Sequence, residues 1–202
     1  MRIGIYRGGF SPIHNGHVMA AKAFMQQMWL DVLYILPSAT AQGNANAWQR
    51  LKMCELAFEN VDGVLISDFE IRHSENCDAL TALRAFASDE HRLFLLMGTD
   101  ELLTLDRQRD VEEMFRLCYP VYMRREGNDP ILDARIVAKI SDYQQKYGKV
   151  VRRITGDPIA VSSTSVRSAV ASGKDISRMV PPAVEKYIRE SGLYKTQGGV
   201  TQ

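Results

Sequence analysis

Short apolar segments alternate with helical segments along the whole chain, and this alternation constrains the fold more than any other feature. Short apolar runs predict strands at 2–6, 32–36, 64–67, 92–97, 120–123 and 150–154, of which 92–97 is the clearest buried strand, and the third strand could continue to residue 71. Apolar residues at helical spacing predict helices at 17–28, 48–59, 79–87, 110–117, 132–147, 163–172 and 181–191.

Strands that alternate with helices are typical of an α/β fold, in which a parallel sheet is covered by helices on both faces. The 202 residues are enough for one substantial core, and the chain shows neither an internal repeat nor a clear linker. We therefore expect a single domain over residues 1–194 and a flexible tail at 195–202. Ligands of such sheets bind beyond the carboxyl ends of the strands.

Charge and cysteine content argue against several classes of protein. The formal net charge is +1, which gives no electrostatic reason to expect nucleic-acid or membrane binding. Cys54, Cys77 and Cys118 are odd in number and far apart, so they suggest neither a disulfide framework nor a zinc ribbon. The chain shows no signal peptide and no membrane-spanning stretch. These features predict a cytoplasmic protein with reduced thiols, and they leave a homo-oligomer open.

The first strand leads into a segment whose residues suit a phosphate group. Residues 7–17 read Arg-Gly-Gly-Phe-Ser-Pro-Ile-His-Asn-Gly-His. Gly8 and Gly9 allow a backbone to approach a ligand closely, and the helix that follows presents unpaired N–H groups and a positive dipole end. His14 and His17 add hydrogen bonds or charge at the same place. The alternative to phosphate binding is a structural role, in which the histidines bond carbonyl groups of the loop. This alternative is more credible for one of the two histidines than for both.

A zinc site is another interpretation of this histidine pair. Zinc needs three or four protein ligands, and only His73 and His91 remain in the chain. No glutamate stands beside the pair as it does in the metalloprotease motif. We therefore predict no resident metal site and favour phosphate binding.

A second candidate segment, residues 161–167, reads Val-Ser-Ser-Thr-Ser-Val-Arg. Ser162 or Ser163 is a natural N-cap. Arg167 then lies about one turn into a helix, where the dipole disfavours a cation. An anion held between the helix N-terminus and Arg167 would remove this conflict. Taken alone, however, the segment is more often a capped helix whose arginine points into solvent.

Two further strand ends carry weaker signals. The carboxylate of Asp100, after Gly98 and Thr99, could contact a ribose hydroxyl or cap the helix that follows. Arg124 and Arg125 could face a phosphate or remain solvated. Because parallel strands end at one edge of a sheet, the segments 8–17, 98–100 and 162–167 are expected to converge there.

Together these segments resemble the nucleotidyltransferase superfamily, and within it the bacterial nicotinate-nucleotide adenylyltransferases. Residues 7–17 resemble the signature G-G-T-F-D-P-I-H-x-G-H, and residues 161–167 resemble I-S-S-T-x-I-R. Residues 180–188, with Leu193 and Tyr194, resemble the C-terminal end of that family. Residues 49–53, 98–103 and 124–125 follow the order of its internal landmarks.

The resemblance implies a Rossmann-like fold and a reaction in NAD biosynthesis. In this reaction AMP passes from ATP to the phosphate of nicotinate mononucleotide, pyrophosphate leaves, and Mg²⁺ accompanies ATP. The implied catalytic residues are His14, His17 and Arg167. The implied ATP-binding residues are Gly8, Gly9, Phe10, His14, His17, Gly98, Asp100, Ser163, Thr164 and Arg167. The resemblance implies that the two histidines face the ATP phosphates and that Arg167 and Ser163 hold the β- and γ-phosphates. It implies that Asp100 bonds the adenosine ribose. Lys22 and Arg50 are too ambiguous to be given a role.

The chain departs from the family chiefly where the acceptor would bind. Aligned on the histidines, Arg7 replaces a glycine, Gly9 replaces Thr or Ser, and Ser11 replaces Asp or Asn. The Pro-Pro-His-Lys stretch is missing from residues 37–43, and residues 76–79, Asn-Cys-Asp-Ala, replace the Ser-Tyr-Thr element that reads the pyridine carboxylate. Residues 104–109 lack the aromatic side chain that stacks on the pyridine.

These departures leave two other hypotheses open: an adenylyltransferase with a different phosphorylated acceptor, or a nucleotide-binding protein without turnover. Arg107, Arg109 or Trp48 could replace the missing acceptor contacts. Without such a replacement we expect ordinary ATP binding and weaker turnover of nicotinate mononucleotide than is normal for the family.

Overall fold

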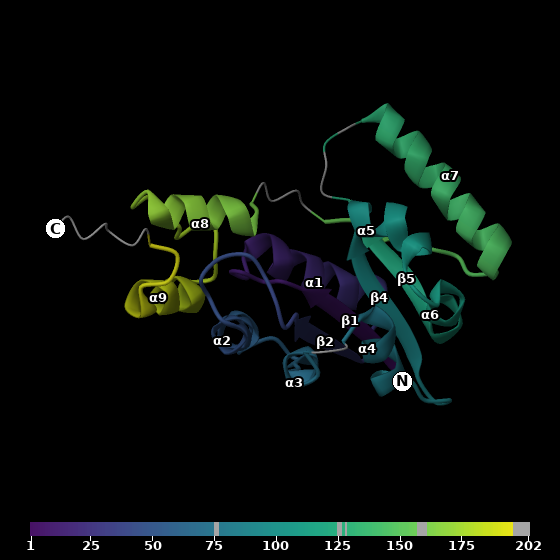
Figure 1. The fold of residues 1–202 in the computed structure, drawn as a ribbon, viewed down its shortest axis with the longest axis horizontal. Coiled ribbons are helices and arrows are strands. Elements are labelled where there is room, and N and C mark those ends of the chain that lie inside the picture. The colour runs from purple at the N-terminus through teal and green to yellow at the C-terminus, as the bar shows by residue number, and fades with distance from the viewer. Residues whose placement is uncertain (75–76, 125–126, 128, 157–160, 196–202) are drawn as a thin grey trace.

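A parallel sheet forms the centre of the computed structural model, which describes residues 1–74, 77–124, 127, 129–156 and 161–195. Its strand order is β3-β2-β1-β4-β5-β6, and every pairing is parallel (Figure 1). The strands are β1 (Arg2–Gly8), β2 (Val32–Pro37), β3 (Val64–Ile66), β4 (Arg92–Gly98), β5 (Cys118–Met123) and β6 (Arg152–Ile154). This order is the one found in doubly wound Rossmann-type folds, so the predicted fold class is confirmed.

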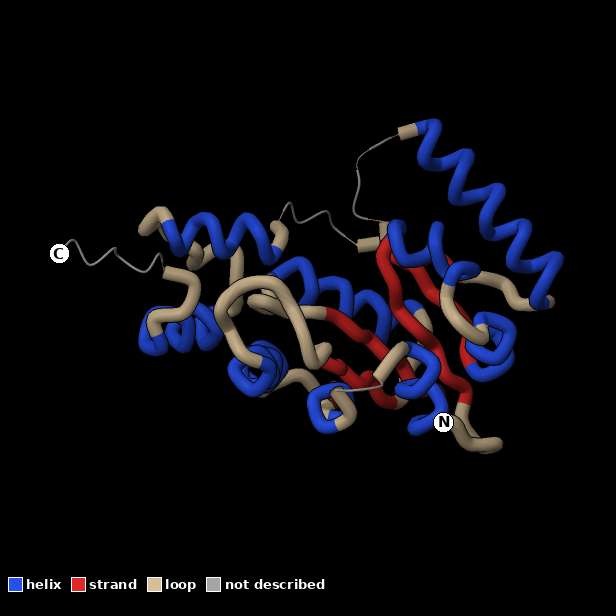
Figure 2. Tube along the Cα trace, in the orientation of Figure 1, coloured by secondary structure: helices blue, strands red, loops and turns tan. Residues whose placement is uncertain are grey.

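The helices in the described part of the chain alternate with these strands (Figure 2). They are α1 (Asn15–Gln27), α2 (Ala47–Phe58), α3 (Phe69–Arg72), α4 (Ala79–Phe86), α5 (Thr99–Thr104), α6 (Val111–Leu117), α7 (Pro130–Tyr147), α8 (Ser163–Ala171) and α9 (Pro182–Ser191), with a 3₁₀ turn at Leu105–Arg107. The suggested continuation of the third strand to residue 71 is wrong, because β3 ends at Ile66 and α3 follows. The predicted tail falls almost wholly outside the described residues.

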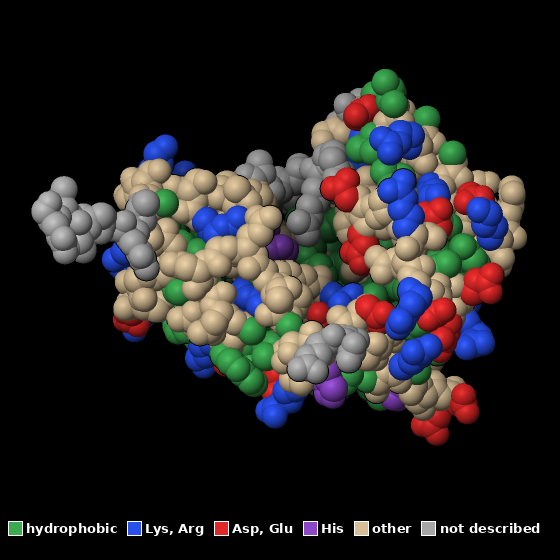
Figure 3. Space-filling model, in the orientation of Figure 1, with side chains coloured by type: hydrophobic (Ala, Val, Ile, Leu, Met, Phe, Trp, Pro, Cys, Tyr) green, Lys and Arg blue, Asp and Glu red, His purple; other side chains and the backbone are tan. Residues whose placement is uncertain are grey.

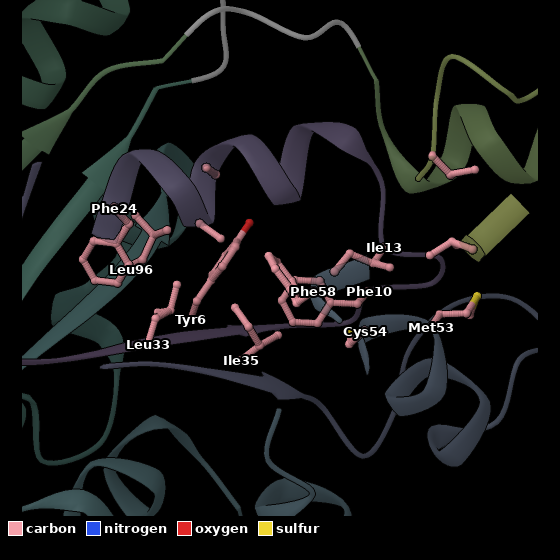
Figure 4. Packing of buried hydrophobic residues seen from close by; sticks show 14 of the residues in the cluster. Tyr6, Phe10, Ile13, Phe24, Leu33, Ile35, Met53, Cys54, Phe58 and Leu96 are labelled. Carbon is pink, nitrogen blue, oxygen red and sulfur yellow. The ribbon is translucent and has the colours of Figure 1, made fainter. Parts of the chain in front are cut away.

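Two apolar cores lie on opposite faces of the sheet. Along β1, Tyr6 contributes to the core covered by α1, α2, α8 and α9, and Ile3 and Ile5 contribute to the core covered by α4, α5, α6 and α7. Figure 4 shows Tyr6, Phe24 and Leu33 grouped with other apolar side chains between α1 and the strands. Helices therefore cover both faces, as predicted, and the strand ends remain available to a ligand.

The sheet changes its direction of winding between β1 and β4. From β1 the chain proceeds outward through β2 to β3, and it then returns to place β4 on the other side of β1. In open α/β sheets the crevice at this switch point is the usual ligand site. Within the described residues, no helix has both the length and the apolar character that crossing a bilayer would require.

Candidate active site

A cavity of about 320 Å³ lies at the switch point, beyond the carboxyl ends of β1 and β4. Residues 6–8, Phe10, His17 and residues 96–101 line it. Histidine atoms are visible in the hollow near the centre of the face shown in Figure 3. The cavity therefore brings together two segments that the sequence predicted to converge, the glycine-histidine segment and Gly98–Asp100.

The two predicted histidines form one unit at the start of α1. His14 is the N-cap residue, and its carbonyl accepts the N–H of His17 at 2.9 Å. The backbone N–H of His14 donates to Nδ1 of His17 at 3.3 Å, and the two rings stack with centroids 3.6 Å apart. Because Nδ1 acts as an acceptor here, a neutral His17 carries its proton on Nε2. His17 thus completes the helix cap and also lines the cavity, so the structural and ligand-binding interpretations are compatible.

Phe10 supports His17 from the side. Its ring meets the imidazole edge to face, with centroids 5.0 Å apart, and it meets Tyr6 in the same way at 5.3 Å. Phe10 has a positive φ of 43°, which is rare for a non-glycine residue and turns the chain sharply after β1. A Cβ added to Gly8 would lie 3.0 Å from the Phe10 ring, so glycine fits this position closely. Phe10 therefore packs the wall of the cavity.

A buried arginine, Arg50 of α2, lies beneath the glycine segment. It donates to the carbonyl oxygens of Gly9 at 2.8 Å and Ala39 at 3.0 Å, and only 1% of it is exposed. Burial lowers the pKa of its guanidinium, although Tyr194 and Cys54 act in the opposite direction. Arg50 therefore fixes the loop after β1 to the loop after β2, a role for which the sequence pattern gives no signal.

Helix α8 brings the second predicted segment to the same loop. Ser162 is its N-cap, and the Ser162 side chain accepts the Ser165 N–H at 3.0 Å. Ser163 Oγ donates to the carbonyl oxygen of Pro12 at 2.9 Å. Arg167 donates to Ser11 O at 2.7 Å and to Thr164 Oγ1 at 3.2 Å, and it is half-buried. The solvent-facing alternative for Arg167 is wrong, because these contacts hold it against the loop that carries the histidines.

The C-terminal part of the chain closes over this loop. The Tyr194 hydroxyl lies 3.2 Å from Ser11 Oγ, and the Tyr194 N–H donates to Asn44 Oδ1 at 3.0 Å. Burial raises the pKa of Tyr194 to about 12, so it is protonated at neutral pH. Nearby Gly43 has a φ of +97°, and a Cβ there would lie 2.9 Å from Cδ of Arg167. Residues from both ends of the chain therefore shape the site.

An ion pair lies on the opposite wall of the cavity. Arg7, at the end of β1, donates from Nε to Glu70 Oε1, and Glu70 is only 2% exposed. Burial would lower the pKa of Arg7, but the hydrogen bond and charge of Glu70 outweigh it and raise that pKa. Burial raises the pKa of the neighbouring Glu101, Arg7 opposes this effect, and Glu70 adds to it. The substitution of Arg7 for the motif glycine was the only sequence signal of this group.

Asp100 lies in the first turn of α5, where it is exposed at the cavity. The N-cap of α5 is Gly98, so the alternative in which Asp100 caps this helix is not realised. Thr104 bonds the backbone of Asp100, its Oγ1 donating to the Asp100 carbonyl at 2.8 Å. The Asp100 carboxylate is thus placed where a bound ligand could meet it.

Several candidates lie away from the cavity. Arg124 bonds Asp133 and the carbonyl of Gly127, so it is neither solvated nor placed at a phosphate site. Arg109 is exposed beside Asp78 and Asp110. Trp48 is 53% exposed and lies near Arg72, and Arg107 is exposed in the 3₁₀ turn. None of Trp48, Arg107 and Arg109 lines the cavity. Asn76 and Arg125 lie outside the described residues.

Comparisons with known proteins identify the family of the chain. Residues 5–169 match the model of the cytidylyltransferase-like family. A probable nicotinate-nucleotide adenylyltransferase of Pseudomonas fluorescens is 32% identical over 96% of the chain and 97% of its own length. One from Gemmatimonas aurantiaca is 32% identical over 96% and 93% of the two chains. Among solved structures, one match is Plasmodium falciparum nicotinic acid mononucleotide adenylyltransferase complexed with NaAD. It superposes with a TM-score of 0.67 and covers 96% of this chain and 97% of that one. The sequence identity is 14%, so this likeness shows the fold alone.

Proposed function

Because the chain belongs to the cytidylyltransferase-like family, and within it to the nicotinate-nucleotide adenylyltransferases, we propose that it transfers AMP from ATP to nicotinate mononucleotide. The product is the dinucleotide, and pyrophosphate leaves. This reaction belongs to NAD biosynthesis. Two other hypotheses remain, a different acceptor or nucleotide binding without turnover, and a substrate panel distinguishes them from this proposal.

The observation that carries this proposal is the meeting of the two signature segments. Hydrogen bonds from Ser163 to Pro12 and from Arg167 to Ser11 hold the start of α8 against the loop before α1. Two helix N-termini, two histidines and one arginine therefore surround a single loop at the switch point. Helix N-termini and guanidinium groups are the usual protein partners of phosphates.

The reaction needs no protein nucleophile. An oxygen of the acceptor phosphate forms a bond to the α-phosphorus of ATP, and the bond from that phosphorus to the bridging oxygen of the β-phosphate breaks. The protein has to align the two phosphates and stabilise the charge that develops. His14 and His17 are placed at the glycine segment to contact the ATP phosphates, with Nε2–H of His17 as a donor. Arg167 and Ser163 hold the β- and γ-phosphates, Thr164 and Gly98 contribute to the same nucleotide site, and Asp100 bonds the adenosine ribose.

Magnesium fits this site as a companion of ATP. Mg²⁺ is commonly held by one or two carboxylates together with substrate phosphates and water. Within the described residues no group of three or more His, Cys, Asp or Glu side chains could hold a metal ion by itself, and the triphosphate of ATP would supply oxygen ligands for Mg²⁺. This arrangement suits an ion bound mainly by the triphosphate, which would neutralise part of its charge. The thiols of Cys54, Cys77 and Cys118 are free, which supports the cytoplasm as the compartment.

A substrate panel tests the proposal. The purified protein is incubated with ATP, Mg²⁺ and one acceptor at a time, and pyrophosphate release is measured for nicotinate mononucleotide, nicotinamide mononucleotide and other phosphorylated acceptors. We expect turnover of nicotinate mononucleotide that His17→Ala strongly reduces. Turnover of a different acceptor alone would contradict the assigned substrate. ATP binding without any turnover would favour the binding-only hypothesis.

A further inference from the structure

We propose that Arg7 is a specificity-determining residue that binds the carboxylate of the acceptor base. This inference rests on the proposed function, because it concerns the acceptor end of the same site. It assigns a contact in a region where the chain lacks the recognition element of its relatives. The argument depends on the placement of Arg7, on its unused hydrogen-bond donors and on the chemistry of the cavity wall.

Arg7 lies on a different face of the sheet from the phosphate-binding candidates. Side chains alternate along β1, so Arg7 shares a face with Ile3 and Ile5, whereas Tyr6 packs with Phe10 and His17 on the other face. Both faces meet at the carboxyl end of β1, where Arg7 and His17 line one cavity. A mononucleotide that extends through this cavity can therefore place its phosphate near His17 and its base near Arg7.

Arg7 is fixed by one hydrogen bond and has further N–H donors available for a ligand. Its Nε is bonded to Glu70, and its side chain is 20% exposed. Its two terminal nitrogens make no hydrogen bond to any residue that the structure describes. A guanidinium fixed through one nitrogen, with its remaining N–H groups at a cavity, is arranged to grip a second carboxylate by paired bonds.

The charges of the cavity wall also favour this role. Among the described residues that line the cavity, Arg7 is the only Lys or Arg. Glu70 compensates the charge of Arg7 and so makes its burial tolerable. Burial raises the pKa of the neighbouring Glu101, so this carboxyl takes on negative charge beside Arg7 less readily than an exposed glutamate does.

The two substrates of the test differ only in the group that Arg7 would meet. Nicotinate mononucleotide carries a ring carboxylate, and nicotinamide mononucleotide carries a neutral carboxamide in its place. Arg7→Gln removes the charge, and Arg7→Lys keeps the charge but removes the planar fork. The matched control is Arg109→Gln, since Arg109 is 77% exposed and lies outside the cavity.

We expect Arg7→Gln to raise the KM for nicotinate mononucleotide by roughly 10- to 100-fold, the effect of losing one charge-assisted contact. The KM for the nicotinamide form and the affinity for ATP should change by less than about threefold, within the effect of a surface substitution. Arg7→Lys should give an intermediate loss, and Arg109→Gln no loss. Thermal melting and ATP titration check folding, and Arg7→Lys, which retains a cation for Glu70, provides the test if Arg7→Gln does not fold.

Contradictory results separate the two proposals. If the wild-type protein uses nicotinate mononucleotide and Arg7→Gln keeps the same preference between the two acceptors, Arg7 does not bind the carboxylate and the adenylyltransferase assignment stands. Equal losses with both acceptors would make Arg7 a structural residue. If the wild-type protein uses neither acceptor, the proposed function fails and this inference fails with it.

Discussion

The guanidinium of Arg167 donates a 2.7 Å hydrogen bond to the carbonyl oxygen of Ser11. The two residues are 156 positions apart in the chain, and their contact joins helix α8 to the loop that precedes α1. One cation in the first part of α8 thus orders the loop that leads to α1. Substitutions at and around Arg167 therefore test the phosphate site most directly.

Replacing Arg167 by lysine should weaken ATP binding while leaving the fold intact. Lysine keeps the charge but cannot bond Ser11 and a phosphate through one planar fork. We expect a loss of about 1–3 kcal/mol in binding free energy, measured by calorimetry with ATP. Arg72→Lys is the control, because Arg72 is exposed and pairs with Asp68, four residues before it. Equal ATP affinity in wild type and Arg167→Lys would remove Arg167 from the phosphate site.

Gly43→Ala should act on the same arginine indirectly. The new methyl group would lie 2.9 Å from Cδ of Arg167, at a φ of +97° that alanine rarely adopts. We expect both a lower melting temperature and weaker ATP binding. Gly173→Ala separates the two effects, because φ is +66° there but no atom of the residues that the structure describes lies within 4 Å of the added Cβ. That control should lose stability and keep its ATP affinity; a loss of affinity in both variants would point to general destabilisation.

His17→Ala should lower kcat by about 100-fold or more, the effect of removing one donor to the developing charge. The variant also loses the Nδ1 acceptor for the His14 N–H, so its melting temperature has to be measured alongside. His91→Ala is the matched control, since His91 bonds the carbonyl of Phe86 outside the cavity. Unchanged pyrophosphate release by a folded His17→Ala protein would exclude His17 from catalysis.

Arg50→Met should destabilise the protein by about 2–4 kcal/mol. Methionine fills much of the same space but leaves the carbonyls of Gly9 and Ala39 without their charged donor. Urea unfolding measures the change, and exposed Arg72→Met should stay within about 0.5 kcal/mol of wild type. Because the Gly9 loop also lies at the site, Arg50→Met should bind ATP more weakly than wild type. An unfolding free energy equal to that of wild type would show that neither carbonyl depends on Arg50.

The acceptor preference should depend on pH through Glu101. Its pKa is raised, so its carboxyl holds a proton at a higher pH than an exposed glutamate does. As the pH rises through this pKa, Glu101 gains a negative charge beside Arg7 and repels the acceptor carboxylate. The ratio of KM for the nicotinate form to KM for the nicotinamide form should therefore increase with pH, and Glu101→Gln should flatten it. A ratio that follows the same curve in both proteins would rule out Glu101 as the titrating group.

The strands β3 and β6 are short and partly exposed. The sheet could be predicted chiefly from its central strands β1, β2, β4 and β5, which are largely buried and read as apolar runs. β4 is the clearest example, with residues 93–97 all buried. The short helices escaped prediction for a physical reason. α3 and α5 are four and six residues long, too short for a helical period to be seen. The start of α1 was placed two residues late, at residue 17, because its N-cap is His14 and not one of the usual capping residues.

The glycine-histidine segment and the cap at Ser162 could be singled out from local pattern, because the residues of each segment are neighbours in sequence. The supporting residues could not be found in this way. Arg50 bonds a backbone carbonyl 41 residues away, and Arg7 meets Glu70 across 63 residues. Contacts of this kind depend on how the loops fold over the sheet. Arg124 was misjudged for the same reason, because its partner Asp133 belongs to the following helix.

The contact between Ser11 and Tyr194 also orders events during synthesis of the chain. The glycine-histidine segment leaves the ribosome first, yet Ser163, Arg167 and Tyr194 must follow before its loop has all its neighbours. A nascent chain that lacks residues beyond 160 lacks all three of these partners, and it also lacks the α8 and α9 residues of one core. The loop before α1 therefore gains its full set of contacts only after residue 194 has been synthesised.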